Sequence, residues 1–366
     1  MLIFLILQTF LLNFLLFQLI YKTLFIIQRI CYLRCMFYSA IIPVYNRPDE
    51  VADLLESFAA QEGTVSFEIV IVEDAAQLPC DKIVAQYKEQ LNIRYFNMPD
   101  TDRSYRRNYG MQQAKGNYFL FFDSDCIIPP RYFINLESNL RENYSDCFGG
   151  PDAAHESFSD VQKAINYAMT SFFTTGGIRG GKAQMEKFKP RTFNMGFSRE
   201  VFEKTGGFKD MFGEDIDLSI RIDKAGFRTA LYRDLFVYHK RRVSFTKFYK
   251  QIHNFGVARV NLAVLHKGSL KIVHSFPALF LSGGMAILIL AIFLYPWLLL
   301  FPATYTLLLL FDALVKTRKI KTALLAVWAS YIQLIGYGWG FLKSFASKIV
   351  FGKKLEDSET LKRIYN

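Results

Sequence analysis

The sequence predicts an α/β domain with a mostly parallel sheet, followed by apolar helices that enter a membrane. Over residues 37–240, short apolar runs alternate with stretches of helical periodicity, as in sheets covered by helices on both faces. Beyond residue 270, three apolar stretches approach the length that spans a bilayer core. The chain of 366 residues is 51% hydrophobic, which excludes an intrinsically disordered protein.

Each element of the α/β region is predicted from its apolar pattern and the residues that interrupt it. The first apolar run ends near Pro43 and Asn46, and Val51, Leu54 and Phe58 then recur at helical spacing. Strands are expected over residues 38–44, 67–72, 93–96 and 118–122, and helices over residues 49–60, 80–90, 105–115 and 161–169. Because ligands bind at the carboxyl ends of parallel strands, polar residues that follow a strand are the candidates for a site.

Charge and cysteine usage indicate a membrane-attached protein that faces a reducing compartment. The formal net charge is +11, yet residues 36–270 contain 30 basic and 29 acidic residues. The excess flanks the apolar ends, which is typical of the cytoplasmic side of a membrane and argues against nucleic-acid binding. The five cysteines form no C-x-x-C pair and no zinc-ligand spacing, which favours free thiols: Cys31, Cys35, Cys80, Cys126 and Cys147.

Residues 1–35 are expected to form an uncleaved N-terminal membrane anchor. This stretch lacks the basic n-region and the small residues at its end that a cleaved signal peptide would have. The alternative is that translation starts at Met36 and that residues 1–35 are upstream sequence. The mass of the mature chain distinguishes the two.

The C-terminal third predicts a helical hairpin and a third apolar stretch. Residues 276–294 and 297–315 are two apolar runs, and four basic residues between 316 and 321 mark the cytoplasmic side. The third run, 323–341, is followed by basic residues that a full span would place on the far side. This run therefore lies in the interface, re-enters, or breaks the positive-inside rule, and the sequence leaves the three open.

Two aspartates, Asp123 and Asp125, directly follow the apolar strand 118–122. A site with so few carboxylates suits a divalent cation that also takes oxygens from a substrate phosphate. The alternative is an acidic turn that caps the next helix.

A second acidic group, Glu214, Asp215 and Asp217, opens a helix that continues through Ile220 and Ile222. Acids in a first turn complement the helix dipole, which is one explanation of this pattern. The other is that one of these carboxylates serves as a general base.

Five motifs occur in a fixed order, and together they carry a family resemblance. They are Pro43-Val44-Tyr45-Asn46-Arg47, Val72-Glu73-Asp74, Arg106-Arg107-Asn108, Phe121-Phe122-Asp123-Ser124-Asp125 and Gly213-Glu214-Asp215-Ile216-Asp217-Leu218. This series resembles the family-2 inverting glycosyltransferases with the GT-A fold, over roughly residues 38–240. The C-terminal helices resemble those of membrane-attached bacterial members. Residues 148–155 and 179–181 resemble a subgroup that builds exopolysaccharides or cell-surface glycans.

On the donor side, the resemblance implies a nucleotide-sugar site. Pro43, Tyr45 and Asn46 match the loop that receives the nucleotide, and Asp74 matches the acid that binds the base of a uridine-type donor. Arg107 matches the arginine near the diphosphate.

On the metal and acceptor side, the resemblance implies Mn2+ or Mg2+ as the cofactor. Asp123 matches the acid at the nucleotide and metal, and Asp125 matches the direct metal ligand. His239 lies where many members place a second metal-contacting residue; the alternative is an ordinary interfacial histidine. Asp215 matches the catalytic base, with Glu214 beside it in the acceptor site.

The chain also departs from the family pattern. Glu73-Asp74-Ala75-Ala76 replaces the usual Asp-Asp-Gly-Ser, and residues 100–104 replace the usual Gly-Pro, so donor selection is expected to differ. The Q-x-x-R-W motif of processive synthases is absent from the sequence, which favours transfer of a single sugar.

Two further segments give weaker signals. Residues 176–182 nearly spell a phosphate-binding P-loop, but Ala183 replaces the Ser or Thr that coordinates magnesium. We expect a mobile loop near the acceptor there, or a plain connection. Residues 240–250 place five basic residues among Phe245, Phe248 and Tyr249, which favours an interfacial helix on anionic lipid over a solvated face.

The sequence thus predicts a membrane-bound, metal-dependent inverting glycosyltransferase on the cytoplasmic face of a bacterial inner membrane. Its partners would be a nucleotide-sugar donor, a glycan or lipid-linked acceptor, and the membrane. Transfer to a polyprenyl phosphate, and a catalytically dead membrane scaffold, are the alternatives. Five segments are expected: an anchor (1–35), a GT-A domain (36–243), an amphipathic interfacial helix region (244–270), transmembrane or interfacial helices (271–346) and a basic polar tail (347–366).

Overall fold

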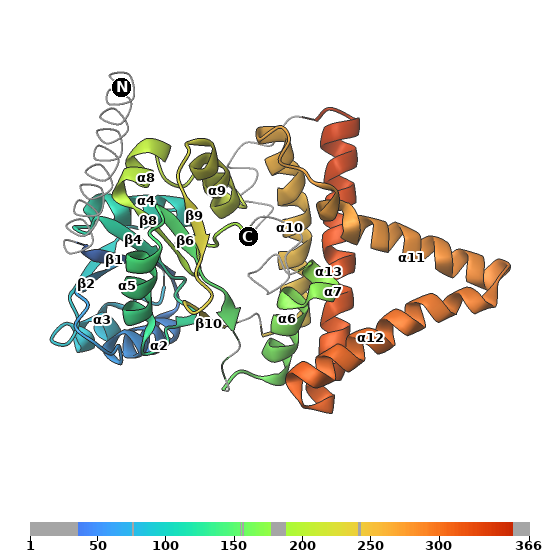
Figure 1. The fold of residues 1–366 in the computed structure, drawn as a ribbon, viewed down its shortest axis with the longest axis horizontal. Coiled ribbons are helices and arrows are strands. Elements are labelled where there is room, and N and C mark those ends of the chain that lie inside the picture. The colour runs from blue at the N-terminus through green and yellow to red at the C-terminus, as the bar shows by residue number, and fades with distance from the viewer. Residues whose placement is uncertain are drawn as a thin grey trace, which may run out of the picture.

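The computed structural model describes residues 36–74, 77–153, 155, 157–176, 188–240 and 243–353. The predicted anchor at 1–35, the loop residues Ala75 and Ala76, most of the segment that resembles a P-loop, and the end of the tail lie outside these residues. The described chain forms a sheet domain with a group of long helices beside it (Figure 1).

A seven-stranded sheet forms the centre of the sheet domain (Figure 1). Its order is β3 (Ile93–Asn97), β2 (Phe67–Asp74), β1 (Tyr38–Tyr45), β4 (Tyr118–Phe121), β8 (Met195–Ser198), β6 (Cys147–Gly149) and β9 (Thr229–Leu231). The first four strands are parallel, β8 is antiparallel to β4 and β6, and β6 and β9 are parallel. The predicted α/β fold with a mostly parallel sheet is confirmed.

Helices cover both faces of this sheet because its central strands bury side chains on both sides. Ala40 and Ile42 of β1 pack in one core, whereas Ile41 packs in the other. The first core is closed by α2 (Pro48–Ala59), α3 (Asp81–Tyr87) and α5 (Tyr132–Glu142), and the second by α4 (Arg103–Gln113), α8 (Arg199–Thr205) and α9 (Glu214–Lys224).

The described cysteines are buried in these cores. Cys80, Cys126 and Cys147 are free thiols, as expected. Burial, together with the neighbouring Glu73, raises the pKa of the Cys80 thiol, and burial likewise raises the pKa of the Cys147 thiol. Cys80 and Cys147 are therefore unreactive packing groups.

A small second sheet lies at the edge of the domain, in the order β5 (Cys126–Ile127), β10 (Val237–His239) and β7 (Asp152–Ala153). Its register places His239 opposite Cys126, directly after Asp125. Residues more than 100 positions apart in the sequence are thereby brought together.

The remaining helices lie beside the sheet domain. They are α6 (Asp160–Thr170), α7 (Phe172–Thr175), α10 (Phe245–Leu265), η1 (Ile272–Ser275), α11 (Phe276–Phe293), η2 (Pro296–Leu299), α12 (Leu300–Thr317), α13 (Ile320–Phe345) and η3 (Ala346–Val350). Three helical segments among the described residues are long and apolar enough to cross a membrane: Ile272–Phe293, Pro296–Thr317 and Ile320–Val350.

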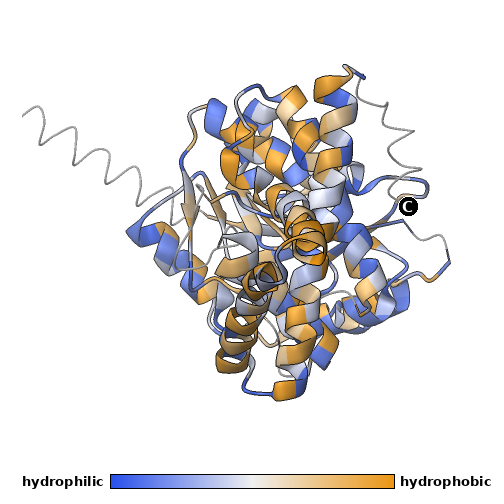
Figure 2. Ribbon diagram, turned by 90° about the vertical axis from the view of Figure 1, so that its right-hand side faces the viewer, coloured by the Kyte–Doolittle hydropathy of each residue, from blue (hydrophilic) through white to orange (hydrophobic). Residues whose placement is uncertain are grey.

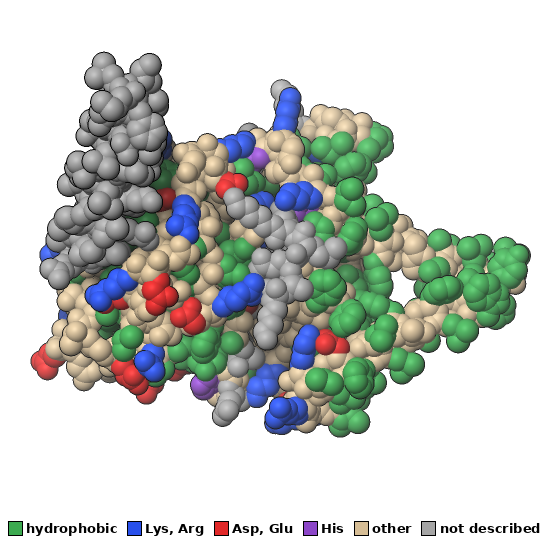
Figure 3. Space-filling model, in the orientation of Figure 1, with side chains coloured by type: hydrophobic (Ala, Val, Ile, Leu, Met, Phe, Trp, Pro, Cys, Tyr) green, Lys and Arg blue, Asp and Glu red, His purple; other side chains and the backbone are tan. Residues whose placement is uncertain are grey.

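The predicted hairpin is formed by α11 and α12, which project away from the rest of the molecule (Figure 1). Their residues are predominantly hydrophobic (Figure 2), and hydrophobic side chains cover the hairpin surface (Figure 3). Only 11% of the apolar window in either helix is buried within the protein. An exposed apolar surface of this extent is typical of a segment that contacts a membrane or another apolar partner.

The third apolar run forms α13, which the protein covers to a much larger extent. Of its apolar window, 44% is buried, since α13 packs against α10, α6 and the hairpin. Glycines allow this close approach: a Cβ at Gly340 would lie 2.2 Å from the carbonyl oxygen of His253, and one at Gly338 would lie 2.4 Å from that of Pro277. α13 thus connects α10 with the hairpin.

Candidate functional site

The carboxyl ends of β1, β2 and β4 bring the first group of predicted residues to one edge of the sheet. β1 and β2 pair along their whole length, so Tyr45 lies opposite Asp74. Asp123 follows the neighbouring strand β4. Pro43 is buried within β1, two residues before the edge, whereas half of the Tyr45 side chain is exposed there.

Asn46 and Asp74 each have a defined partner at this edge. The Asn46 side-chain oxygen accepts hydrogen bonds from the backbone N–H groups of Gln77 and Leu78 at 3.0 and 3.1 Å, so it orders the loop after β2. Asp74 pairs with Arg106 at 3.2 Å, and the Arg106 guanidinium lies 5.9 Å from the Tyr45 ring.

Arg107 connects the two acidic motifs. Its side chain is fully buried on α4, and its Nη2 and Nη1 atoms donate to Asp123 Oδ1 and Glu214 Oε1, each at 2.8 Å. Asp102 caps this helix by accepting from the backbone N–H of Tyr105, which holds the first turn of α4 against the strand ends. Asp123 and Glu214 are therefore fixed by one buried cation.

Asp125 and His239 form a separate pair. His239 Nε2 lies 3.1 Å from Asp125 Oδ1, and Phe193 stacks on the imidazole with ring centroids 4.8 Å apart. Arg47 approaches the other Asp125 oxygen at 3.5 Å. On its far side, His239 Nδ1 is 3.9 Å from the buried Asp152.

These groups fit a divalent cation. Asp125, Cys126 and His239 each offer a ligand atom, and the three atoms lie within 4.8 Å of one another. The carboxylate oxygen suits Mn2+ or Mg2+, and the imidazole is a ligand that Mn2+ accepts more readily than Mg2+. The Cys126 thiol donates to the backbone oxygen of Phe193. Asp123, which the family resemblance also assigns to the metal, is oriented by Arg107 instead.

The acids of the second motif point in three directions, although they lie within one helical turn. Gly213 begins the helix with φ of 88°, a conformation that favours glycine. Glu214 then bonds Arg107, and Asp217 is fully buried against Arg221 and His266, both at 2.7 Å. Asp215 is left beside the cavity, with Arg191 at 3.5 Å from its Oδ2 atom.

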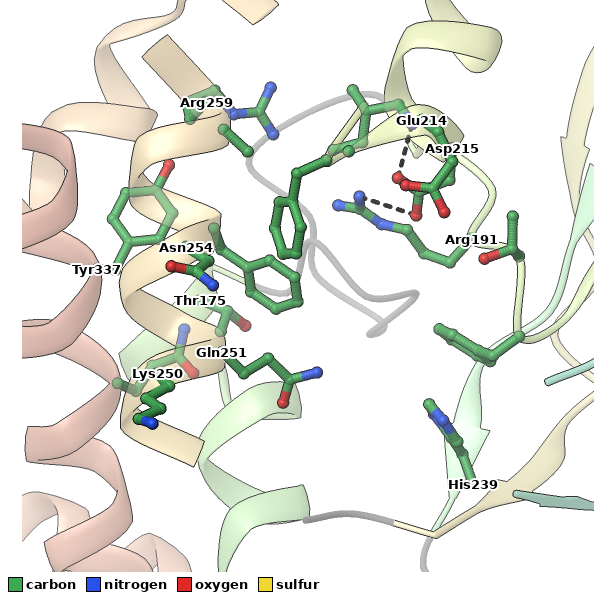
Figure 4. A pocket seen from close by; sticks show the side chains of 18 of the residues that line it. Thr175, Arg191, Glu214, Asp215, His239, Lys250, Gln251, Asn254, Arg259 and Tyr337 are labelled. Atoms are coloured by element: carbon green, nitrogen blue, oxygen red, sulfur yellow. Dashed lines mark hydrogen bonds and ion pairs between the residues drawn. The ribbon is translucent and has the colours of Figure 1, made fainter. Parts of the chain in front are cut away.

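One cavity of about 1090 Å³ connects these groups. Asp123, Asp125, His239, Glu214 and Asp215 all line it, and its opposite wall is α10 with parts of α11 and α13. Figure 4 shows Gln251 and Asn254 on α10 facing His239, Arg191 and Asp215 across the open space. The arrangement can hold an anionic ligand at a metal on one side and deprotonate a group on the other.

Several residues of the site have no counterpart in the sequence-based set. Arg106 pairs with Asp74. Its position beside Arg107 in the motif Arg106-Arg107-Asn108 was the feature of the sequence that could have identified it as a site residue. Arg191 follows Pro190 in a segment without a recognisable motif, so only its distance to Asp215 reveals it. The segment 177–187, where the sequence predicts a loop near the acceptor, lies outside the described residues.

Comparison with known proteins finds relatives that are similar to parts of the chain. The chain is 23% identical over 237 residues to a hyaluronan synthase of Pasteurella multocida, covering 55% of this chain and 24% of the relative. It is 31% identical over 114 residues to the poly(ribitol-phosphate) beta-N-acetylglucosaminyltransferase TarS of Staphylococcus aureus, covering 30% of this chain and 20% of TarS. The chain thus matches less than a quarter of the length of either relative.

Among solved structures, the mannosyltransferase PcManGT of Pyrobaculum calidifontis has the same fold. The TM-score is 0.57 at 15% sequence identity, covering 81% of this chain and 86% of that one. Residues 39–206 match the sequence profile described as glycosyl transferase family 2. The described sheet domain therefore has a GT-A-like fold, and residues 39–206, just under half of the chain, match the model of glycosyl transferase family 2.

Proposed function

We propose that the protein is a metal-dependent inverting glycosyltransferase that moves a single sugar from a UDP-linked donor to an acceptor hydroxyl. One observation carries the proposal: the Asp125–His239 pair and Asp215 line the same cavity, with the buried Arg107 joined to both acidic motifs between them. A metal site, a diphosphate-binding cation and a candidate base are the groups that such a transfer needs.

The donor would lie over the strand ends. Asp74, oriented by Arg106, can accept a hydrogen bond from the imide N–H of a uracil base, and Tyr45 offers an exposed ring for stacking. Asp125 and His239, assisted by Asp123, would hold Mn2+ or Mg2+, which neutralises the charge that develops on the departing diphosphate. PcManGT, which shares the fold, has been solved with GDP-mannose and Mn2+.

Asp215 would act as the general base. It takes the proton from the acceptor hydroxyl, whose oxygen bonds to the anomeric carbon while the bond from that carbon to the diphosphate oxygen breaks. A single displacement from the opposite face inverts the configuration. Arg191, at 3.5 Å from Oδ2, offers this carboxylate a cationic neighbour in the same cavity.

The acceptor would be a glycan or a lipid-linked saccharide used in cell-surface polysaccharide synthesis. The named relatives, a hyaluronan synthase and TarS, support a polymer-building role. The apolar hairpin beside the cavity supports attachment to a membrane, which we propose is the bacterial inner membrane with the sheet domain facing the cytoplasm. Because prenyl phosphates partition into such a membrane, transfer to a polyprenyl phosphate is the second candidate.

Calorimetric titration of the full chain with UDP, with and without Mn2+, tests the proposal. We expect binding that requires the metal and is lost in Asp125→Asn. Asp234→Asn, which changes an exposed acid that bonds Asn139 outside the cavity, is the matched control. Absence of metal-dependent UDP binding to the wild-type protein would favour a membrane scaffold without catalytic function.

A further inference from the structure

The cavity has two walls of different chemistry. The wall formed by the sheet domain carries acids, namely Asp123, Asp125, Glu214 and Asp215, together with cations such as Arg47, Arg103 and Arg191. The wall formed by α10 carries cations and neutral polar groups instead, namely Lys247, Lys250, Gln251, Asn254 and Arg259. In Figure 4 Lys250, Gln251 and Asn254 lie across the open space from Asp215 and His239. Because the α10 wall has cations and no acids, it favours a ligand that carries an anionic group in addition to the group that faces Asp215.

Arg259 is the cation of this wall that most clearly lacks a protein partner. Its side chain is only 7% exposed, and its Nη1 atom has no hydrogen-bond partner among the described residues. Gln333 of α13 lines the same cavity, is 8% exposed, and its Oε1 atom likewise has no partner there. Buried polar atoms are rarely left in this state, and a buried guanidinium is costly unless a ligand supplies the opposite charge.

Arg259 lies on α10 beside residues that pack against the helix of the candidate base and residues that pack against the apolar hairpin. One turn further along α10, Leu262 packs with Ile216 and Ile220 of α9, the helix that begins at the Asp215 motif. Val260, which directly follows Arg259, packs with Ala278 near the start of α11. Arg259 therefore lies between the chemistry and the base of the apolar hairpin.

The cavity continues past Arg259 along apolar and aromatic side chains. Phe276, Pro277 and Phe280 of α11 line it, as do Tyr305 of α12 and Leu334 of α13. The lining of this one cavity thus combines the carboxylate of Asp215, the buried cation of Arg259 and apolar side chains of the hairpin. An amphiphile with a sugar, an anionic linker and a hydrocarbon chain has one group to match each of them.

We propose that the acceptor is a saccharide linked through phosphate to a membrane lipid, and that Arg259, with Gln333 beside it, binds this phosphate. The proposal rests on the proposed function and names the acceptor class for it. Arg259 binds rather than reacts: the sugar hydroxyl faces Asp215, and the lipid chain leaves along α11. A phosphate oxygen acting as the nucleophile would need no base, so the carboxylate at 215 favours a sugar hydroxyl as the attacking group.

Binding measurements on the full chain in neutral detergent test this site apart from turnover. With UDP and Mn2+ present to fill the donor site, we would titrate farnesyl diphosphate, farnesyl phosphate, farnesol and inorganic pyrophosphate by thermophoresis. We expect at least one farnesyl phosphate to bind more tightly than farnesol and pyrophosphate. Preference for the diphosphate or the monophosphate identifies the linker, and either supports the site.

Variants at Arg259 supply the decisive comparison. Because hydrogen bonds to a charged group are among the stronger ones, we expect Arg259→Gln to weaken farnesyl phosphate binding about tenfold or more, and Arg259→Lys to recover part of it. Arg141→Gln, which changes an exposed arginine on α5, is the matched control and should have no effect. Unchanged UDP binding in Arg259→Gln shows that the protein is folded.

Two results would overturn the inference. Equal binding of the farnesyl phosphates by wild-type protein and Arg259→Gln would remove Arg259 from the site. Equal binding of pyrophosphate and farnesyl diphosphate, both dependent on Arg259, would identify a site for a free anion and not for a lipid. Failure of UDP to bind at all would instead count against the proposed function, and it is measured separately.

Discussion

Replacement of Asp215 by Asn separates the candidate base from its two acidic neighbours. Asn keeps the size of the side chain and can still accept from the backbone N–H of Ile216, a contact of 2.8 Å in the wild-type protein. It cannot take a proton. General-base assistance contributes about 10²–10⁴-fold, or about 2.7–5.4 kcal/mol of activation free energy, so kcat should fall by that factor.

The rest of the site should be unaffected by this change. Arg107, which fixes Asp123 and Glu214, does not contact Asp215, so we expect UDP affinity within about twofold of wild type. Loss of the 3.5 Å contact with Arg191 should alter the free energy of unfolding by about 1 kcal/mol or less. Nucleotide release with purified protein and Mn2+ measures turnover, and calorimetry measures UDP binding.

The control is Asp223→Asn, an exposed acid on the same helix. It should keep wild-type turnover. Near-normal turnover of Asp215→Asn would refute the assignment, and a parallel loss of UDP binding would show that Asp215 supports the donor site and not the acceptor.

Four further substitutions address other parts of the site. Asp125→Asn and His239→Ala should each weaken Mn2+ binding about tenfold or more, since each removes a ligand atom; electron paramagnetic resonance of Mn2+ measures this, and unchanged affinity would place the metal elsewhere. Asp217→Ala should lower the free energy of unfolding by about 3–5 kcal/mol, because Arg221 and His266 lose a fully buried partner; a denaturant titration that shows no loss would contradict the structural role. Asp74→Ala should reduce the preference for UDP over other nucleoside diphosphates, read as a ratio of dissociation constants, and an unchanged ratio would mean that the base is recognised by other residues.

Much of the fold follows from local patterns. The strands at β1, β2 and β4 are apolar on both faces, which only a sheet covered on both sides can satisfy. Since parallel strands end at a common edge, the polar residues after them were expected to gather, and Tyr45, Asp74 and Asp123 do lie there. The start of α4 was missed by two residues because Asp102, an acid in a polar stretch, acts as its cap.

The roles within each motif depend on contacts that no pattern contains. Glu214, Asp215 and Asp217 are equivalent as acids in a first turn, yet one binds Arg107, one lines the cavity and one is buried. Arg191 and Arg259 belong to no motif, and their importance comes from what lies opposite them in space. The assignment of roles to the site residues stays a prediction until the variants are measured.

The sequence by itself determined the sheet, the hairpin and the acidic motifs, because strand alternation, apolar length and residues at strand ends are local properties of the chain. Only the tertiary structure shows that the third apolar run packs against α10, α6 and the hairpin, and that α10 forms the second wall of the cavity. Glycines in α13 let its backbone approach those of α10 and α11, so the run is packed as a connecting helix. That packing presents Arg259 and Gln333 to the same cavity as Asp215, a juxtaposition that arises from long-range contacts and is therefore invisible in the linear sequence.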